Sequence, residues 1–539
     1  MSCSAASIPQ PDPRLAAIVA QLESQLADKD QQLTDKDRQL ARKDQALALA
    51  EMKIQVLEER LRRDRIARYG KHSETLSDLQ MQLLDLEPGV SSEEVEAESQ
   101  REPLPASPSE DNTCPGKPRR RHPGRQELPS HLERVEQIIV CGPEQCNCGR
   151  CGQQTTVIGY EETEVLDVRP AEYYVKVIKR EKRACRSCEE QGVQTAPLPE
   201  RIVPRSVLSD QMIIEAVVNK YCASLPLYRQ QAILQRDAGV QIALSTLDDG
   251  VLRVGDLLMP IATAMKREVL SGTYIQADET PVGVQTHDKR GRNHQAYMWQ
   301  YGSPGKGVVF DFRMGRESEG PRQFLGDFHG LLQTDGYQGY NHVGGPGMVH
   351  AGCLAHARRK YVDAVKVQGN DRESAHIVEL MDELFAIDRE AREQNLDHAQ
   401  RNVLRQQRAP KLLEQIRAAA LALQKTALPR SAAGQAAGYT LSLWNKLTVF
   451  LKYPELELST NLAENAMRSI ALGRKNWLHL GSKQAGPRIA AIFSVVESCR
   501  RLNIPVRKYL GQVLPGLANR SIQSLAELTP KAYAAKPAS

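Results

Sequence analysis

Long apolar runs are absent from this chain of 539 residues. No run approaches the roughly 18 apolar residues of a membrane-spanning helix, which excludes a transmembrane protein. The first residues, MSCSAASIPQPDPR, also lack the apolar core of a secretory signal. We therefore expect a cytoplasmic protein. The length is too great for one core and, at about 150 residues per domain, predicts three or four units.

A large excess of charge of one sign is also missing, because 71 Lys and Arg residues oppose 66 Asp and Glu residues and leave a net charge of +5. Basic residues are nevertheless concentrated between Glu464 and Lys508. They are Arg468, Arg474, Lys475, Lys483, Arg488, Arg500, Arg501, Arg507 and Lys508. Such a patch suits a polyanion, although many basic patches are only solvated.

A heptad pattern runs through the first part of the chain. The apolar residues that recur every seven positions are Val19, Leu26, Leu33, Leu40, Leu47, Ile54 and Leu61. The second position of the seam is Lys at 29, 36 and 43, so the coiled coil is weaker than one with two apolar rows. We predict an oligomerisation arm over residues 1–86. The alternative is a single charged helix that folds onto its own domain.

Residues 87–135 change in composition. They are first acidic and rich in Pro and Ser, and they end in the basic run GKPRRRHPGR. This composition predicts a disordered linker with a basic end.

Six of the eleven cysteines fall between residues 141 and 188. Two CxxC pairs, Cys148 with Cys151 and Cys185 with Cys188, can bring four thiolates together around one Zn²⁺. Two strand-like segments, VIGYEETEVLDV and EYYVKVIKREKR, lie between the pairs. We predict a zinc ribbon over residues 136–204 with a structural ion. Disulfides are the alternative, which a cytosolic location disfavours.

Residues 205–270 show helical periodicity. Two helices are expected on either side of Gly239, and Ser245 and Thr246 are expected to open the second. This arrangement resembles a helix-turn-helix, with Arg229, Gln230 and Arg236 available for DNA. The alternative is an ordinary helical bundle.

Two acidic residues follow apolar, strand-like segments. Asp278 in TYIQADETP and Asp335 in LLQTDG are each expected at the end of a strand, a common place for chemistry in α/β folds. Glu464 lies in STNLAENAMRSIALGR on a predicted helix that Ser459 or Thr460 would cap. The alternatives are a surface turn at Asp278 and an i,i+4 pair of Glu464 with Arg468.

The pattern around these residues predicts a three-strand meander followed by a crossover strand, a fifth strand and a basic helix over residues 355–366. The gap between Asp335 and Glu464 is too long for one strand-helix step. We therefore predict a helical insertion over about residues 368–452 within a catalytic domain over residues 271–480. A basic helical region over residues 481–539 follows.

Four motifs in this order, QADETPV, QTDGY, CLAHARRKY and NLAENAMRSIALGRKNWLHLGS, closely resemble those of the insertion-sequence-66 (IS66) family of bacterial DDE transposases. The resemblance implies a multidomain α/β protein with a ribonuclease-H-like core, in which Asp278, Asp335 and Glu464 are the catalytic triad. The chain departs from the family at His479, where an aromatic residue is usual. It departs also at Ser459 and Thr460, where Asp or Asn is usual.

Carboxylates suit Mg²⁺ or Mn²⁺, and two such ions would support in-line phosphoryl transfer. We expect Asp278 and Asp335 to be shared ligands and Glu464 to bind one of the ions, with Glu279 as a fallback. Candidate DNA contacts are Arg468, Arg474, Lys475, Asn476, Arg358 and Arg359. Cys353 and His356 resemble a C-x-x-H element of several DDE recombinases, and we expect them to pack behind the metal ligands.

These features together predict a transposase that acts as a homo-oligomer. It would bind the terminal inverted repeats of its element and target DNA, with accessory proteins as possible partners, and would cleave and join strands at one site. A catalytically silent DNA-binding regulator and a ribonuclease-H-type nuclease without strand transfer are the alternatives.

Overall fold

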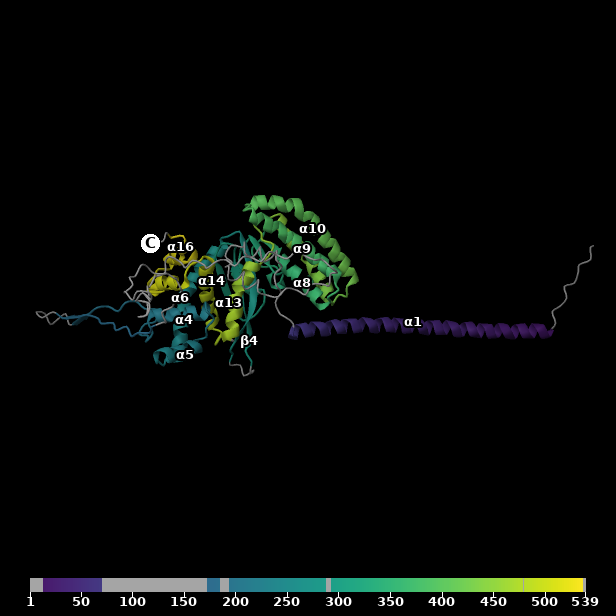
Figure 1. Ribbon diagram of the computed structural model, residues 1–539, viewed down its shortest axis with the longest axis horizontal. Helices are drawn as coiled ribbons and strands as arrows, with labels where there is room; N and C mark the ends of the chain where they lie inside the picture. Colours follow the sequence, from purple (N-terminus) through teal and green to yellow (C-terminus); the bar gives the residue numbers. More distant parts are fainter. Residues whose placement is uncertain (1–12, 70–171, 185–192, 287–291, 478, 537–539) are drawn as a thin grey trace, which may run out of the picture. The chain divides into compact units, whose positions relative to one another are not determined.

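The computed structural model describes residues 13–69, 172–184, 193–286, 292–477 and 479–536 (Figure 1). The chain divides into two compact units, one made of Met1–Ser107 with Pro199–Ser539 and the other of Pro108–Leu198. The predicted linker and all four predicted zinc ligands lie outside the described residues. Among the described helices, none is long and apolar enough to cross a membrane.

The N-terminal helix α1 extends over Pro13–Tyr69, which confirms the helical prediction for this segment. Its heptad residues are exposed: Val19 is 48 % exposed, and Leu26 and Leu61 are each 68 % exposed. An apolar stripe of this kind is stabilised when a second helix covers it. The exposed stripe is compatible with an oligomerisation arm, which stays a prediction.

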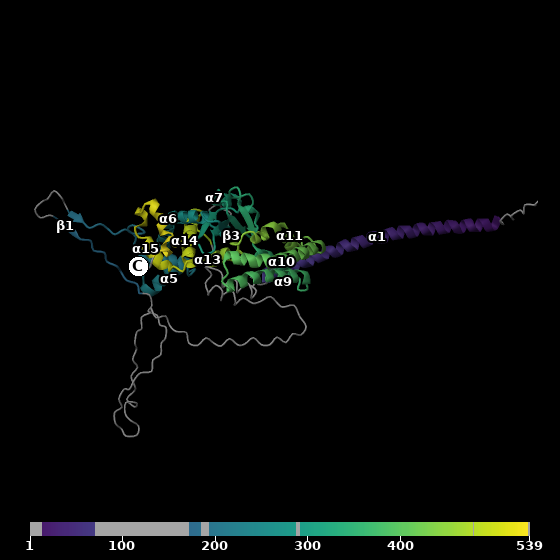
Figure 2. The same ribbon diagram turned by 90° about the horizontal axis from the view of Figure 1, so that it is seen from above.

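The described part of the second unit contains two short strands. Strand β1 (Lys182–Ala184) pairs antiparallel with β2 (Val193–Thr195), and Ala184 lies opposite Val193 (Figure 2). Cys185 follows β1 directly, so the second CxxC pair falls in the connection between two paired strands. Residues 172–181 were predicted to be strand-like, but they form no regular strand.

Five strands form a mixed sheet in the first unit, in the order β5-β4-β3-β6-β7. Their bounds are β3 Tyr274–Val284, β4 His294–Gly302, β5 Val308–Arg313, β6 Leu331–Thr334 and β7 Val349–Gly352. Strands β3, β4 and β5 are antiparallel neighbours, whereas β6 pairs parallel with both β3 and β7. The predicted meander and crossover strands are confirmed. Both faces are covered, since the neighbours Met298 and Trp299 are both buried.

Helices from distant parts of the chain cover the sheet. Helix α14 (Ala485–Arg501) packs on β5 and on α6 (Leu244–Leu270), and α13 (Asn461–Trp477) packs on β3 and β4 (Figure 1). Gly255 permits the close crossing of α6 and α14, because a Cβ atom there would lie 2.7 Å from the Cβ of Arg488. The two helical regions predicted on either side of the catalytic domain therefore share its core.

The two predicted helices before the sheet are present. They are α5 (Leu227–Ala238) and α6, which begins at Leu244. Gly239 caps the end of α5 in a left-handed conformation with φ of 65°. Ser245 and Thr246 lie in the first turn of α6 and do not cap it. Gln230 was predicted to be available for DNA, but it is buried and donates hydrogen bonds to backbone carbonyls of its own domain.

Near its start, α6 exposes Asp248 and Asp249. These carboxylates would repel phosphates, so the structure does not favour α6 as a recognition helix.

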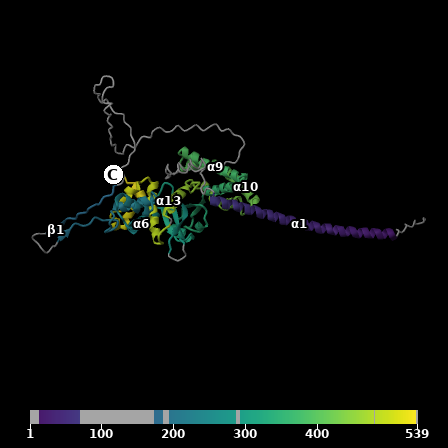
Figure 3. The same cartoon turned by 60° about the horizontal axis from the view of Figure 1, so that its bottom comes forward.

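The segment predicted as a helical insertion is helical. It contains α9 (Arg372–Glu393), α10 (His398–Thr426), α11 (Ala432–Ser442) and α12 (Trp444–Leu447), and it follows α8 (Leu354–Val367). Helices α9 and α10 lie side by side (Figures 2 and 3). Helices α8 to α12 build a second apolar core, which Ala351 of β7 and the segment before α13 also join.

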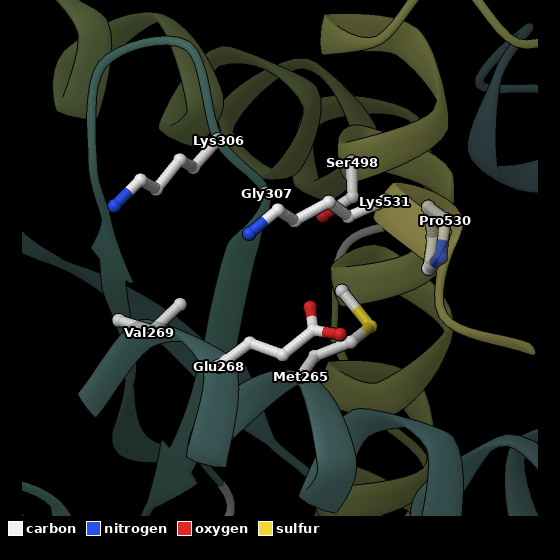
Figure 4. A pocket seen from close by; sticks show the side chains of 8 residues that line it. All are labelled: Met265, Glu268, Val269, Lys306, Gly307, Ser498, Pro530 and Lys531. Carbon is white, nitrogen blue, oxygen red and sulfur yellow. The ribbon is translucent and has the colours of Figure 1, made fainter. Parts of the chain in front are cut away.

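A small pocket lies between α6, the β4–β5 turn and α16 (Pro530–Ala534) (Figure 4). Lys306 and Lys531 line it together with Glu268, whose carboxylate accepts a hydrogen bond from Thr529 at 2.7 Å. None of the candidate catalytic or DNA-binding residues lines this pocket, so we assign no function to it.

Candidate active site

Asp278 and Asp335 lie at the same level of two neighbouring parallel strands. In the parallel pairing of β3 with β6, Gln276 lies opposite Gln333, and that pairing ends there. Each Asp lies two residues further along its strand direction. Asp335 directly follows β6, as predicted, whereas β3 continues to Val284, so the prediction that Asp278 ends a strand was wrong. The parallel pairing of β3 with β6 ends two residues before Asp278. The edge of β3 that faces β6 is therefore not paired with β6 at Asp278.

Two buried glutamines fix this level of the sheet. The Gln276 side-chain amide donates hydrogen bonds to Gln333 at 3.2 Å and to the Ser459 carbonyl at 3.1 Å. The Gln333 amide donates to the Glu457 carbonyl at 2.7 Å. Because alternate residues of a strand share a face, Asp278 and Asp335 face the same side of the sheet as the segment that leads into α13.

Helix α13 places Glu464 on this side. The helix begins at Asn461, and Glu464 lies in its first turn, where its backbone N–H donates to the Thr460 carbonyl at 3.0 Å. The predicted apolar stripe is buried, and it consists of Ala463, Ala466, Met467 and Ile470. The opposite side of the helix stays accessible, and the Glu464 side chain is 27 % exposed.

The Glu464 carboxylate has cationic neighbours on α8. Arg359 donates a hydrogen bond to Oε2 at 3.1 Å, and the His356 Nε2 atom lies 3.3 Å from Oε1. Burial alone would raise the pKa of Glu464, but Arg359 and His356 lower it below its ordinary value. The charge of Arg468, the predicted i,i+4 partner, also contributes to the lower pKa. Glu464 is therefore held ionised.

The Asp278 carboxylate has the opposite environment. Its Oδ1 atom accepts a hydrogen bond from the backbone N–H of Glu279 at 2.9 Å. Burial, followed by the negative charges of Glu464, Glu279 and Asp335, raises the pKa of Asp278 to about 7. The carboxylates of Asp278 on β3, Asp335 directly after β6 and Glu464 on α13 thus lie close enough for Glu464 and Asp335 to act on Asp278. A cation between them would relieve this repulsion.

The donor chemistry fits a divalent metal, because carboxylate oxygens are the ligands that Mg²⁺ and Mn²⁺ prefer. Within the described residues, no three His, Cys, Asp or Glu side chains are arranged to hold an ion. The Glu464 carboxylate instead contacts Arg359 and His356 of α8. Coordination by all three carboxylates would require Glu464 to exchange these contacts for the metal.

Cys353 and His356 lie beside Glu464, where they connect the start of α8 to the start of α13. The buried Cys353 sulfur accepts a hydrogen bond from the Thr460 backbone N–H at 3.3 Å. Burial would raise the pKa of Cys353, but the charge and hydrogen bond of His356 lower it. Burial would likewise lower the pKa of His356, yet Cys353 and Glu464 raise it to about 10.

The structure separates the predicted DNA contacts into two groups. Arg359 is 38 % exposed next to Glu464, and Lys475 is exposed at the end of α13. Arg358, in contrast, is 4 % exposed and pairs with Asp382 through two hydrogen bonds of 2.7 and 3.1 Å. This buried ion pair does not favour Arg358 as a DNA contact.

Arg474 and Asn476 also have contacts within the protein. Arg474 donates hydrogen bonds to the Thr280 hydroxyl at 3.0 Å and to the Pro281 carbonyl at 2.6 Å, which ties α13 to β3 just beyond Asp278. The Asn476 side chain donates to the Leu472 carbonyl at 3.1 Å. Arg474 thus holds the helix of Glu464 against the strand of Asp278.

The basic region after Glu464 is partly neutralised by ion pairs. Arg488 pairs with Asp256, and Arg507 pairs with Glu215, each at 2.7 Å. Arg500 pairs with the buried Glu497, also at 2.7 Å. The local excess of basic residues in the sequence therefore overstates the positive charge that this surface offers to DNA.

A further arginine near the carboxylates was missed in the sequence. Arg316 donates hydrogen bonds to Glu279, whose side chain is only 2 % exposed. Glu279 is therefore already engaged, which does not favour it as a fallback metal ligand. Arg316 lies in a loop without a motif, and its closeness to Asp335 results from the crossover of the chain.

Three family models match this chain. The model described as "Transposase IS66 family" matches residues 205–488, and "zinc-finger binding domain of transposase IS66" matches residues 145–189. "Transposase C of IS166 homeodomain" matches residues 56–136.

Two similar proteins come from Sinorhizobium fredii (strain NBRC 101917 / NGR234). Uncharacterized protein y4jD is 34 % identical over 428 residues, which cover 75 % of this chain and 81 % of that protein. Uncharacterized protein y4hP is 28 % identical over 508 residues, which cover 89 % and 88 %.

These matches define the class of the protein as a DNA-binding transposase of a bacterial insertion sequence. The chain belongs to the IS66 transposase family.

The raised pKa of Asp278 makes a testable prediction for protein dialysed free of Mg²⁺. A carboxyl group whose pKa is higher in the folded than in the unfolded state destabilises the fold increasingly as the pH rises from about 4 to about 7. We expect Asp278→Asn to raise the melting temperature at pH 8 by at least about 2 °C, and by less at pH 4.5. Calorimetry at both pH values measures this difference.

Asp397→Asn is the matched control, since Asp397 caps α10 and Asn caps a helix equally well. It should leave the melting temperature nearly unchanged at both pH values. A stabilisation by Asp278→Asn that does not grow with pH would contradict the proposed repulsion.

Proposed function

We propose that this transposase is a DDE enzyme that cleaves the ends of its element and joins them to target DNA, with Asp278, Asp335 and Glu464 as ligands of two Mg²⁺ or Mn²⁺ ions. One observation carries the proposal. Burial of Asp278 and the negative charges of Glu464, Glu279 and Asp335, three of these carboxylates being on separate segments, raise the pKa of Asp278. A fold maintains such repulsion at a cost in stability, which is common where function requires it.

We also propose a ribonuclease-H-like core. The strand order β5-β4-β3-β6-β7 supports it, with three antiparallel strands followed by two strands parallel to the first. In this arrangement the first and fourth strands of the sheet are neighbours, so Asp278 and Asp335 lie at the same level although the chain between them forms two further strands and a helix.

When bound, the divalent ions would supply Lewis-acid stabilisation of the charge that develops in phosphoryl transfer. The residues of the chain hold and orient the reacting groups. Asp278 and Asp335 lie on the rigid sheet and would fix the position of the scissile phosphate. Glu464 would leave Arg359 to become a ligand of one ion. Arg359, released from this pair, could then donate hydrogen bonds to a phosphate oxygen of the strand.

The same arrangement serves both reactions. Water is the nucleophile in the cleavage step, which breaks the phosphodiester and leaves a 3′-hydroxyl. That hydroxyl is the nucleophile in the joining step, in which it displaces a 3′-oxygen of the target strand. Neither step requires a covalent bond to the protein, so the carboxylates need only hold the groups in line.

The central prediction concerns substitutions that keep shape but remove charge. Asp278→Asn, Asp335→Asn and Glu464→Gln should each abolish Mg²⁺-dependent nicking of element-end DNA. Binding of the same DNA should persist, because it depends mainly on Lys and Arg contacts to phosphates. Nicking assays and mobility shifts on one preparation measure both properties.

Asp363→Asn is the control, because Asp363 is an exposed carboxylate on α8, the helix of Arg359. This variant should nick like the wild type. Full nicking by Glu464→Gln would remove Glu464 from the site. A wild-type protein that binds but never nicks with Mg²⁺ or Mn²⁺ would favour the silent regulator, and nicking without joining would favour a simple nuclease.

We propose that Cys148, Cys151, Cys185 and Cys188 hold one structural Zn²⁺. The match of residues 145–189 to a zinc-finger model supports this, as does the position of Cys185 directly after the paired strand β1. Cys148→Ser and Cys185→Ser should each lose the roughly one zinc per chain that elemental analysis would find in the wild type. Cys222→Ser removes an exposed thiol outside this segment and should retain it. Wild-type protein purified without chelator and free of zinc would overturn the assignment.

We propose that α1 forms a coiled coil with a second copy of the chain. Its exposed heptad stripe supports this. Replacing Leu33, Leu40 and Leu47 by Ser should lower the oligomeric state measured by light scattering, because it removes apolar surface from the seam. The control replaces Gln31, Arg38 and Gln45 by Ser on the opposite side of the helix and should leave the oligomer intact. Equal masses for both variants and the wild type would exclude α1 as the main contact.

A further inference from the structure

A second polar cluster adjoins the carboxylates and centres on Arg316, in the loop between β5 and α7 (Glu319–Leu325). Its Nε and Nη2 atoms donate hydrogen bonds to Glu279 Oε1 at 3.0 and 2.6 Å. The other Glu279 oxygen accepts a hydrogen bond from the Tyr340 hydroxyl at 2.8 Å. The Glu279 carboxylate is therefore held on both sides, and it holds the guanidinium in one orientation.

An aromatic ring supports the guanidinium from a second direction. Its central carbon lies 3.9 Å from the ring centroid of Tyr337, a distance typical of a cation–π contact. The Tyr337 hydroxyl donates to the Arg316 carbonyl at 2.8 Å, so side chain and backbone of the arginine are both attached to this tyrosine. The backbone N–H of Tyr337 in turn donates to Asp335 Oδ1 at 2.8 Å. Arg316 is thereby fixed to the turn that presents Asp335.

The charges in this cluster are arranged with the positive group outward. The Glu279 side chain is 2 % exposed, whereas the Arg316 side chain is 41 % exposed. Among the described residues, no hydrogen-bond acceptor is recorded for the Nη1 atom of Arg316. An approaching anion therefore meets the guanidinium before the buried carboxylate, and a donor edge is available to it.

A DNA strand needs such a group at this place. The carboxylates of Asp278, Asp335 and Glu464 repel phosphates, so the strand must be drawn in by cations at the border of the site. Arg359 lies on the Glu464 side, and Arg316 lies on the Asp335 side. A planar guanidinium with a fixed orientation suits a phosphate oxygen better than a mobile ammonium does.

We propose that Arg316 binds a backbone phosphate of the DNA strand that enters the carboxylate site, next to the scissile phosphate on the Asp335 side. Glu279, Tyr340 and Tyr337 are positioning residues that orient its guanidinium. This inference rests on the proposed DDE function, and it adds a substrate contact outside the three carboxylates and the segment after Glu464.

The test combines an arginine variant with neutral phosphates in the substrate. The probe is a duplex with the terminal repeat of the element, in which single phosphates near the cleavage position are replaced one at a time by uncharged methylphosphonates. In the wild type, one replacement should lower the cleavage rate by about tenfold to a hundredfold, the range of a charge-assisted hydrogen bond. Arg316→Ala should show a similar loss on the unmodified probe and no further loss with that one methylphosphonate.

The controls separate a substrate contact from damage to the fold. Arg316→Ala leaves Glu279 buried without its partner, so the double variant Arg316→Ala/Glu279→Gln is measured in parallel and should behave in the same way. Arg316→Lys keeps the charge but not the planar fork and should fall between the wild type and Arg316→Ala. Arg322→Ala removes another exposed arginine, from the helix α7 that follows this loop, and should keep the full methylphosphonate effect.

The outcomes distinguish this inference from the function on which it rests. A wild type that does not cleave the unmodified probe contradicts the proposed function itself. The phosphate contact is overturned if the wild type cleaves the probe but the loss from Arg316→Ala multiplies with the loss from every methylphosphonate. That result leaves the DDE function intact. Loss of additivity at one phosphate supports it.

Discussion

The hydrogen bonds that join Gln276 and Gln333 to the backbone at Glu457 and Ser459 determine where the candidate catalytic carboxylates lie. They set the level at which β3 and β6 end their pairing, and they attach the start of α13 to the same face of the sheet. Three carboxylates distant in sequence therefore lie near enough for Glu464 and Asp335 to raise the pKa of Asp278, which burial also raises. A buried amide left without its partner is costly, so this layer allows little sliding of the segments.

The helical insertion supports the same site. Glu457 is buried and pairs with Arg401 at 3.0 Å and with Arg392, both from the insertion. Burial would raise the pKa of Glu457, but the arginines lower it to about 2. Tyr439 of α11 donates a hydrogen bond to the Asp335 carbonyl, and a Cβ atom at Gly336 would clash with Leu443. The insertion thus packs against the turn after Asp335 and the segment before Glu464, and it helps to hold both in place.

Local patterns in the sequence predicted the strands and helices, the position of Asp335 directly after a strand and the position of Glu464 on a helix. The apolar runs before Asp278 and Asp335 are strands, and the stripe around Glu464 is buried on a helix. Tertiary contacts decided the rest. Arg358 and Arg474 resembled DNA-binding residues, but Asp382 and the β3 backbone are their partners. No sequence motif marked Arg316, because the orientation of its guanidinium depends on Glu279 and Tyr337. Only the fold brings these two residues to it.

The proposed function requires above all that Asp278, Asp335 and Glu464 share divalent metal. Anomalous diffraction from crystals of the protein with Mn²⁺ and element-end DNA tests it most directly. We expect Mn²⁺ peaks within coordinating distance of Asp278 and Asp335, with Glu464 turned from Arg359 toward one of them. Peaks only elsewhere, with Glu464 still paired to Arg359 and the DNA end in place, would contradict it.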